Sequence, residues 1–244
     1  YRLIVVAICG CQPRKETRLA EYGSATSDLL QGLYERGVQH AVALMRHSAR
    51  EYAPDKHDLE NPLTEEGRAF ARPLGSALPT GLTLRGYASP PERCMETAEL
   101  ILDAVAQRGG AGTRHRPLEG LGVFYALDQM KMWKVMNDSG GQVPFLQAWF
   151  RNEVPSDAMI PAEVAANLVL RVVADKLRAP VASKQLDVCI SHDMTLYLVR
   201  DRVLGQAADT ADVEYLDALV AYEEDDALWL VSHHGDPVEV TARL

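Results

Sequence analysis

AVALMRHSAR, residues 41–50, is the stretch of sequence that decides the fold. Its first five residues are apolar and show no alternation, which is typical of a central strand buried on both faces of a sheet. Arg46, His47 and Arg50 follow where such a strand would end. The stretch therefore predicts a buried strand that delivers one imidazole and two guanidinium groups to an edge of the sheet.

Two later segments repeat this design. Residues 82–88 and 186–191 are strand-like, and they are followed by Arg93 and His192 respectively. The carboxyl ends of parallel strands lie together and form the ligand crevice of an α/β sheet. One such residue alone is more simply a solvated or structural side chain, but three segments of the same design predict a shared site. Its members would suit a phosphoryl dianion, and they are Arg46, Arg50, Arg93, His47 and His192.

The remaining sequence alternates helix-like and strand-like runs. Ser89 and Glu92 fit a capping box, which predicts Ser89 as the N-cap of a helix that ends at Gly109. Thr64 is predicted to open another helix. This order predicts a three-layer α/β/α sandwich, with a mostly parallel central sheet and helices on both faces. Further helices are predicted over residues 24–36, 162–177 and 195–204, and a closing hairpin over 219–222 and 228–232.

The length of 244 residues fits one large α/β domain or two small ones. We expect residues 1–40 to form an N-terminal segment with a lead-in helix, and residues 41–244 to form a single domain. Residues 113–161 have weaker periodicity, so we expect a variable insertion over one end of the sheet that sets specificity. Its aromatic residues would line a pocket or form a small satellite core, and they include Tyr125, Trp133, Trp149 and Phe150.

Composition and missing motifs exclude several classes of function. The net charge of −9 and the lack of a Lys/Arg-rich tract argue against a nucleic-acid partner. No apolar run reaches the roughly 18 residues of a membrane span. The four cysteines match no zinc or CxxC spacing, and none has the arginine six residues on that a cysteine-based phosphatase needs. No P-loop or GxSxG motif occurs. His233-His234 is more simply a solvated pair than a metal site, so we expect no metal and no cofactor.

The N-terminal residues allow two interpretations. Arg2, the apolar run at residues 3–11 and the sequence Ile8-Cys9-Gly10-Cys11 resemble the end of a bacterial lipoprotein signal. The alternative is a short buried strand. We favour a cytoplasmic location and leave export or lipid anchoring open. The oligomeric state is not readable from the sequence.

Four stretches match one known family in their order and spacing. They are LMRH at residues 44–47, NPLTEEG at 61–67, ASPPER at 88–93 with ETA at 96–98, and SHDMTL at 191–196. Together they resemble the histidine phosphatase superfamily, which includes phosphoglycerate-mutase-like enzymes and histidine acid phosphatases, over about residues 41–222. The resemblance implies that His47 is the nucleophile that becomes phosphorylated. It also implies a phosphate pocket made of Arg46, Arg50, Arg93 and His192.

The implied function is hydrolysis of phosphate monoesters of small molecules. A neutral imidazole is a good nucleophile, and phosphohistidine is labile enough to be hydrolysed. Arginines can stabilise the charge of the transferring phosphoryl group in place of a metal. Two alternatives stay open, namely a non-catalytic protein that binds a phospho-ligand and a phosphomutase with further cations in its pocket. Candidates for those cations are Arg114, Arg116, Lys131 and Lys134.

The acid that protonates the leaving alkoxide has two candidates. Smaller members of the superfamily usually carry Gly after each histidine, where this chain has Ser48 and Asp193. His192-Asp193 resembles the acid-phosphatase branch, in which this Asp is the donor, although the large inserted helical domain of that branch is missing. Glu119 follows Arg93 by 26 residues, where the smaller branch places its donor. We favour Asp193 and keep Glu119 as the alternative.

Overall fold

The computed structural model describes residues 22–53 and 58–243. The interpretations of the apolar N-terminal run, with Cys9 and Cys11, concern residues outside this part of the chain. Within the described part, no helix is both long and apolar enough to cross a membrane.

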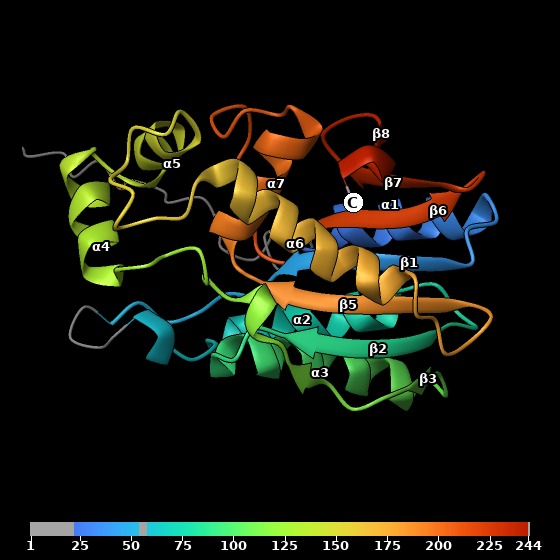
Figure 1. Ribbon diagram of the computed structural model, residues 1–244. Helices are drawn as coiled ribbons and strands as arrows, with labels where there is room; N and C mark the ends of the chain where they lie inside the picture. The colour runs from blue at the N-terminus through green and yellow to red at the C-terminus, as the bar shows by residue number, and fades with distance from the viewer. Residues whose placement is uncertain (1–21, 54–57, 244) are drawn as a thin grey trace, which may run out of the picture.

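One mixed sheet forms the centre of the fold (Figure 1). Its strand order is β3-β2-β5-β1-β6-β7-β8, and β4 also pairs with β2. The parallel part consists of β1 (His40–Arg46), β2 (Thr83–Ala88), β3 (Ala111–Gly112), β4 (Arg116–Pro117) and β5 (Gln185–Ser191). The antiparallel part consists of β6 (Ala218–Glu224), β7 (Ala227–Ser232) and β8 (Val238–Glu239). The predicted α/β fold with a mostly parallel core is confirmed, and so is the closing hairpin.

Strand register brings the ends of the three long parallel strands together. Arg46 is paired with Ser191, and Ala88 is paired with Ile190. The pairing continues past the strand ends, because the His47 amide donates to the Ser191 carbonyl at 3.0 Å and the Ser89 amide to the Ile190 carbonyl at 2.8 Å. The residues that follow β1, β2 and β5 therefore lie side by side at one edge of the sheet.

Helices cover both faces of the sheet (Figure 1). One face is covered by α1 (Ser24–Glu35), α2 (Glu65–Ala77) and α3 (Glu92–Gln107). The other is covered by α6 (Ala162–Leu177) and α7 (Asp193–Leu204). The helices predicted around these ranges are present, with ends that shift by up to a few residues.

The side chains of β1 are divided between two hydrophobic cores. Ala41, Ala43 and Met45 belong to the core under α1, α2 and α3, whereas Val42 and Leu44 belong to the core under α6 and α7. Burial on both faces requires apolar residues at every position, since neither face of the strand meets water. This explains why the strand shows no alternation in its sequence.

Residues 113–161 contain two helices that lie beyond the carboxyl ends of β2 and β5 (Figure 1). They are α4 (Gln129–Asp138) and α5 (Gln142–Phe150), and a 3-10 turn (Glu119–Leu121) precedes them. Tyr125, Trp149 and Phe150 are buried in the core with α6 and α7. The segment thus joins the core on one side and faces the strand ends on the other.

The predicted capping box at Ser89 is wrong. α3 begins three residues later, at Glu92, and Pro91 precedes it without a side-chain cap. The Ser89 side chain is fully buried, and its hydroxyl is hydrogen bonded to Nε2 of His192 at 2.8 Å. A partner from β5, distant in sequence, therefore takes the hydroxyl that local pattern assigned to the helix start. The cap predicted at Thr64 is present, since its Oγ1 accepts from the Gly67 amide at 2.9 Å.

Candidate active site

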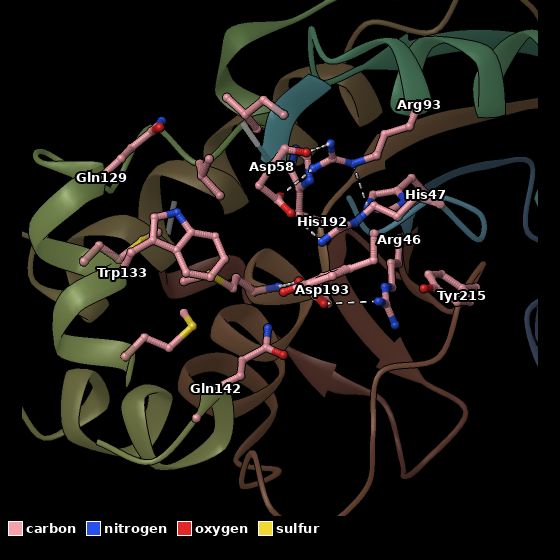
Figure 2. Close-up of a pocket in the computed structure, with 18 of the residues that line it drawn as sticks. Arg46, His47, Asp58, Arg93, Gln129, Trp133, Gln142, His192, Asp193 and Tyr215 are labelled. Carbon is pink, nitrogen blue, oxygen red and sulfur yellow. Dashed lines mark hydrogen bonds and ion pairs between the residues drawn. The ribbon is translucent and has the colours of Figure 1, made fainter. Parts of the chain in front are cut away.

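His47 lies directly after β1 and is almost fully buried (Figure 2). Its Nδ1 is 2.7 Å from the Ser48 carbonyl oxygen, which can only accept, so Nδ1 carries the proton. Nε2 is left with a lone pair, and the Nε of Arg93 donates to it at 3.2 Å. Burial, then the charges of His192 and Arg93, hold the pKa of His47 well below its usual value. The ring is thus neutral, and its unprotonated nitrogen faces an arginine.

The loop after His47 is held by the second and third sequence motifs. The Ser48 hydroxyl donates to the Gly67 carbonyl at 2.7 Å, and the Ser48 amide donates to Oγ1 of Thr97 at 3.2 Å. Gly67 packs so closely that a Cβ there would lie 2.0 Å from the Ala49 carbonyl oxygen. These residues have no contact with the cavity and serve to fix the backbone that carries the histidine.

Arg93 and His192 come from α3 and from the end of β5. The Arg93 side chain is 2% exposed, and its guanidinium reaches both His47 and the Asp58 carbonyl, at 2.7 Å from the latter. The His47 and His192 rings meet edge to face with centroids 5.6 Å apart. Burial and then the charge of Arg93 lower the pKa of His192 to about 3. Both imidazoles are therefore neutral at physiological pH.

Arg46 is held in place on three sides. Its NH1 donates to the Val213 carbonyl at 2.6 Å, and its NH2 pairs with Asp193 at 3.2 Å. The guanidinium stacks on the Tyr215 ring, with 4.1 Å between its carbon and the ring centroid. Its Nε is buried and has no hydrogen-bond partner among residues 22–53 and 58–243. One donor of a well-oriented guanidinium thus has no protein acceptor in the described part of the chain.

Asp58 places a carboxylate between two of the predicted arginines. Its Oδ1 is 2.6 Å from NH2 of Arg50, and its Oδ2 is 3.3 Å from NH2 of Arg93. Figure 2 shows Asp58 on the side of the cavity where the Arg93 guanidinium lies. The arginines thus already bind an oxyanion supplied by the protein. Sequence reasoning missed this residue, since Asp58 lies in a charged segment with no motif of its own.

The two candidate acids lie in different surroundings. Asp193 begins α7, lines the cavity, and accepts from the Met194 amide at 2.7 Å. Burial acts to raise the pKa of Asp193, but Arg46, the Met194 amide, His192 and Gln142 together outweigh it and hold that pKa below its usual value. Glu119 is exposed on its 3-10 turn and is not among the residues that line the cavity. The structure thus brings Asp193, and not Glu119, to His47 and the arginines.

The site opens into a cavity of about 420 Å³. The predicted residues Arg46, His47, Arg50, Arg93, His192 and Asp193 line one end of it. The rest of the lining includes uncharged residues of α4, α5 and neighbouring segments. These include Val123, Gln129, Met132, Trp133, Met136, Asn137, Gln142 and Met194. Of the four aromatic residues considered from the sequence, Trp133 lines the cavity, and the other three belong to the core.

Another cluster of ligand-type side chains lies away from the cavity. Asp217, His233 and His234 each place one ligand atom within 4.8 Å of the others. Both histidines are exposed, and none of the three residues lines the cavity. Any ion held there would not touch the phosphoryl site.

Comparison with known proteins identifies the family. A family model described as the histidine phosphatase superfamily (branch 1) matches residues 42–213. The chain belongs to the histidine phosphatase superfamily. The match is to branch 1, although the His192-Asp193 pair is the feature that resembled the acid-phosphatase branch. No curated protein matches the sequence of this superfamily member at a significant level.

Solved structures of other superfamily members share its fold. A phosphoglycerate mutase from Bacillus anthracis is 15% identical with a TM-score of 0.52, over 81% of this chain and 94% of the other. Bacillus stearothermophilus YhfR is 18% identical with a TM-score of 0.53, over 80% and 100%. A phosphoserine phosphatase from Entamoeba histolytica, in complex with 3-phosphoglyceric acid, is 16% identical with a TM-score of 0.51, over 82% and 95%. At these identities the likeness shows the fold alone.

Proposed function

We propose that this superfamily member is a phosphatase that hydrolyses phosphate monoesters through a phosphohistidine on His47. The observation that carries the proposal is the unprotonated Nε2 of a buried, neutral His47, which accepts a hydrogen bond from Arg93 and lies among Arg46, Arg50 and Arg93. For the attack, the Nε–H of Arg93 has to pass from this nitrogen to an oxygen of the phosphoryl group. A neutral imidazole in that position can attack phosphorus without first losing a proton. The arginines can hold the oxygens of the phosphoryl group as it transfers.

The proposed reaction has two steps. In the first, Nε2 of His47 attacks phosphorus, a P–N bond forms, the P–O ester bond breaks, and Asp193 gives its proton to the leaving alcohol oxygen. In the second, water gives a proton to the Asp193 carboxylate and attacks phosphorus, a P–O bond forms, and the P–N bond to Nε2 of His47 breaks. Inorganic phosphate leaves, and His47 returns to its neutral form. Because the arginines and His192 surround the phosphoryl group, the reaction requires no metal and no cofactor.

The charges around the cavity support hydrolysis over the mutase alternative. A mutase of this kind would need further cations for a second phosphate, yet the cations that line the cavity within residues 22–53 and 58–243 are those beside His47. Lys131 and Lys134 instead pair with Asp157 and Asp138, each at 2.6 Å. Arg114 and Arg116 also lie outside the cavity lining.

The test is the covalent intermediate itself. Mixing with p-nitrophenyl phosphate should release a burst of one p-nitrophenol per site, and an alkaline quench should preserve phosphohistidine on His47 for mass spectrometry. His47→Ala should lower kcat at least about a thousandfold and abolish the burst, because it removes the nucleophile. His233→Ala changes an exposed histidine outside the cavity and serves as the matched control. Near-normal turnover by a folded His47→Ala protein would refute the proposal.

A further inference from the structure

The end of the cavity away from His47 has an apolar wall. α4 supplies Met132, Trp133 and Met136 to it, and Val123 and Met194 complete it from neighbouring segments. Figure 2 shows the Trp133 indole reaching from α4 into the space in front of Asp193 and His192. Met132, Met136 and Met194 are buried, with 4–7% of each residue exposed, so they form a packed wall of the cavity rather than a solvated rim. Thioethers and an indole together favour a flat, polarisable ligand group.

Charge is confined to the phosphoryl end of the cavity. Among the described lining residues, the cations are Arg46, Arg50 and Arg93, and the anions are Asp58 and Asp193. Lys131 and Lys134 lie on the same helix as Trp133, but their ammonium groups pair with carboxylates outside the cavity. Within residues 22–53 and 58–243, a second phosphate or a carboxylate on the leaving alcohol would therefore meet no free cation near Trp133.

Uncharged amides accompany the apolar wall. Gln129 and Asn137 lie on α4, and Gln142 begins α5. Figure 2 shows Gln129 and Gln142 on opposite sides of Trp133. The Gln142 amide is engaged with Asp193, whereas Gln129 and Asn137 lie on the same helix as the indole. Amides can both donate and accept, so they suit the hydrogen-bonding edge of a neutral ring.

We infer that the substrate is a phosphate monoester of an uncharged alcohol that carries a planar aromatic or heteroaromatic ring, stacked on Trp133. The inference rests on the proposed phosphatase activity and adds the class of its leaving group. The phosphoryl group would lie among the three arginines, and the ring would lie between Trp133 and the methionines. The cavity volume is in the range of pockets that enclose a ligand of this size.

The test compares monoesters whose leaving groups are all primary alcohols; those of ethyl and 2-phenylethyl phosphate are also of similar acidity. Relative to ethyl phosphate, 2-phenylethyl phosphate should have a kcat/KM about ten- to a hundredfold higher, as burial of one ring predicts. Phosphoserine, whose alcohol carries charges, should have no such advantage. Trp133→Ala should reduce the ratio between 2-phenylethyl and ethyl phosphate about tenfold. Met130→Ala, an exposed residue of the same helix outside the cavity lining, should leave that ratio unchanged.

The outcomes separate this inference from the proposed function. If ethyl and 2-phenylethyl phosphate turn over equally, or if phosphoserine is preferred, the ring class is wrong while the phosphatase proposal stands. If no ester turns over, calorimetry with 2-phenylethyl and ethyl phosphonate tests the ring separately, because phosphonates bind without being hydrolysed. Tighter binding of the ring-bearing phosphonate would then support the ring class alone. Equal loss of both activities in Trp133→Ala would also overturn the inference, since it would mean a structural role for Trp133.

Discussion

Asp193 faces two opposed requirements in the proposed reaction. It must be protonated to serve as an acid, yet Arg46, the Met194 amide and other neighbours hold its pKa below the usual value in the free protein. A phosphoryl dianion among the arginines brings negative charge next to Asp193 and favours its protonated form. The histidines do not titrate in the working range, because the pKa of His192 is lowered to about 3 and that of His47 is also well below its usual value. Among the side chains that line the cavity, we therefore expect Asp193 to set the pH dependence of proton transfer to the leaving group.

We therefore expect kcat/KM for alkyl phosphates to increase as the pH falls from 8 to 5. A lowered pKa means that the protonated acid is scarce at neutral pH and becomes more abundant towards acid. p-Nitrophenyl phosphate should depend less on pH, since its leaving group hardly needs a proton. Asp193→Asn should slow alkyl esters by about 10²–10⁴ and p-nitrophenyl phosphate far less.

Glu119→Gln is the matched control for this prediction. Because Glu119 is exposed and does not line the cavity, its substitution should have a small and equal effect on both kinds of ester. The reverse pattern, with alkyl esters sensitive to Glu119 and not to Asp193, would make Glu119 the donor.

Asp58 competes with phosphate for the same donors. Its carboxylate is bound by Arg50 and Arg93, so an incoming phosphoryl group has to displace it. Asp58→Asn should lower the inhibition constant of inorganic phosphate about three- to tenfold, because it frees two guanidinium groups that are partly shielded from water. Glu60→Gln, on the same short 3-10 helix, should leave that constant unchanged. A weaker inhibition by phosphate in Asp58→Asn would instead mean that the carboxylate orients the arginines for their ligand.

At the scale of single residues, the sequence predicted the site residues that follow strand ends. It missed a site residue outside the motifs whose side chain contacts the arginines. His47, Arg93 and His192 were found because strand ends converge in a parallel sheet. Asp58 could not be found, since its contacts with Arg50 and Arg93 depend on where the 3-10 helix at Asp58–Glu60 lies in the fold. The sequence did not distinguish Trp133 from Tyr125, Trp149 and Phe150. Only the fold shows that Trp133 lines the cavity while the other three are core residues.

Among the elements, the loop between β1 and α2 depends on one close backbone contact. A Cβ at Gly67 would lie 2.0 Å from the Ala49 carbonyl oxygen, and backbone rather than a movable side chain is in the way. Gly67→Ala should therefore destabilise the fold by about 1–3 kcal/mol and displace the loop that carries His47, which lowers kcat as well. Thermal unfolding and turnover of p-nitrophenyl phosphate measure the two effects.

The matched control is a glycine inside a helix. Gly32 lies in α1 with nothing within 4 Å of its would-be Cβ, so Gly32→Ala should raise stability by roughly 0.5–1 kcal/mol and leave kcat unchanged. If Gly67→Ala behaved like Gly32→Ala, the backbone contact would have no role in the site.

Strands that are buried in the core along their length could be predicted from the sequence. A helix that faces both the core and the cavity could not. β1, β2 and β5 are buried along nearly their whole length, and half-buried positions occur only at strand ends, so their apolar residues marked them clearly. α4 divides its apolar residues between the core and the cavity wall, which weakens its periodicity. The start of α3 was misplaced because a long-range hydrogen bond from His192 outcompeted a local cap at Ser89.

For the whole molecule, we expect activity to persist after exhaustive chelation. Three arginines supply the positive charge at the phosphoryl group, and the cluster of Asp217, His233 and His234 lies outside the cavity. An ion in that cluster would change the melting temperature without changing kcat. Steady-state rates and thermal unfolding, measured with chelator and after addition of zinc or magnesium, distinguish the two. A loss of kcat that added metal restores would contradict the arginine-based mechanism.

The overall architecture could be predicted because the motifs fix the order of the parallel strands along the chain. Apolar runs, and the capping, glycine and proline residues between them, predict the sheet and its two covered faces. They also predict that three strand ends meet. The depth and chemistry of the cavity could not be predicted in this way. They depend on how α4 and α5 sit beyond the strand ends, which is decided by tertiary packing rather than by local pattern.

The position of β1 in the sheet also governs when the protein can first act during its synthesis. Leu44 is flanked by Cys189 on one side and by Leu219 on the other, so both neighbours of the strand are translated long after it. Until they emerge from the ribosome, the histidine of the nascent chain is a solvated imidazole of ordinary basicity, with no pocket around it. A strand that is apolar on both faces also remains exposed to aggregation during that interval. The pocket around His47 can therefore form only after β5 has been made, and β1 has neither of its sheet neighbours until then.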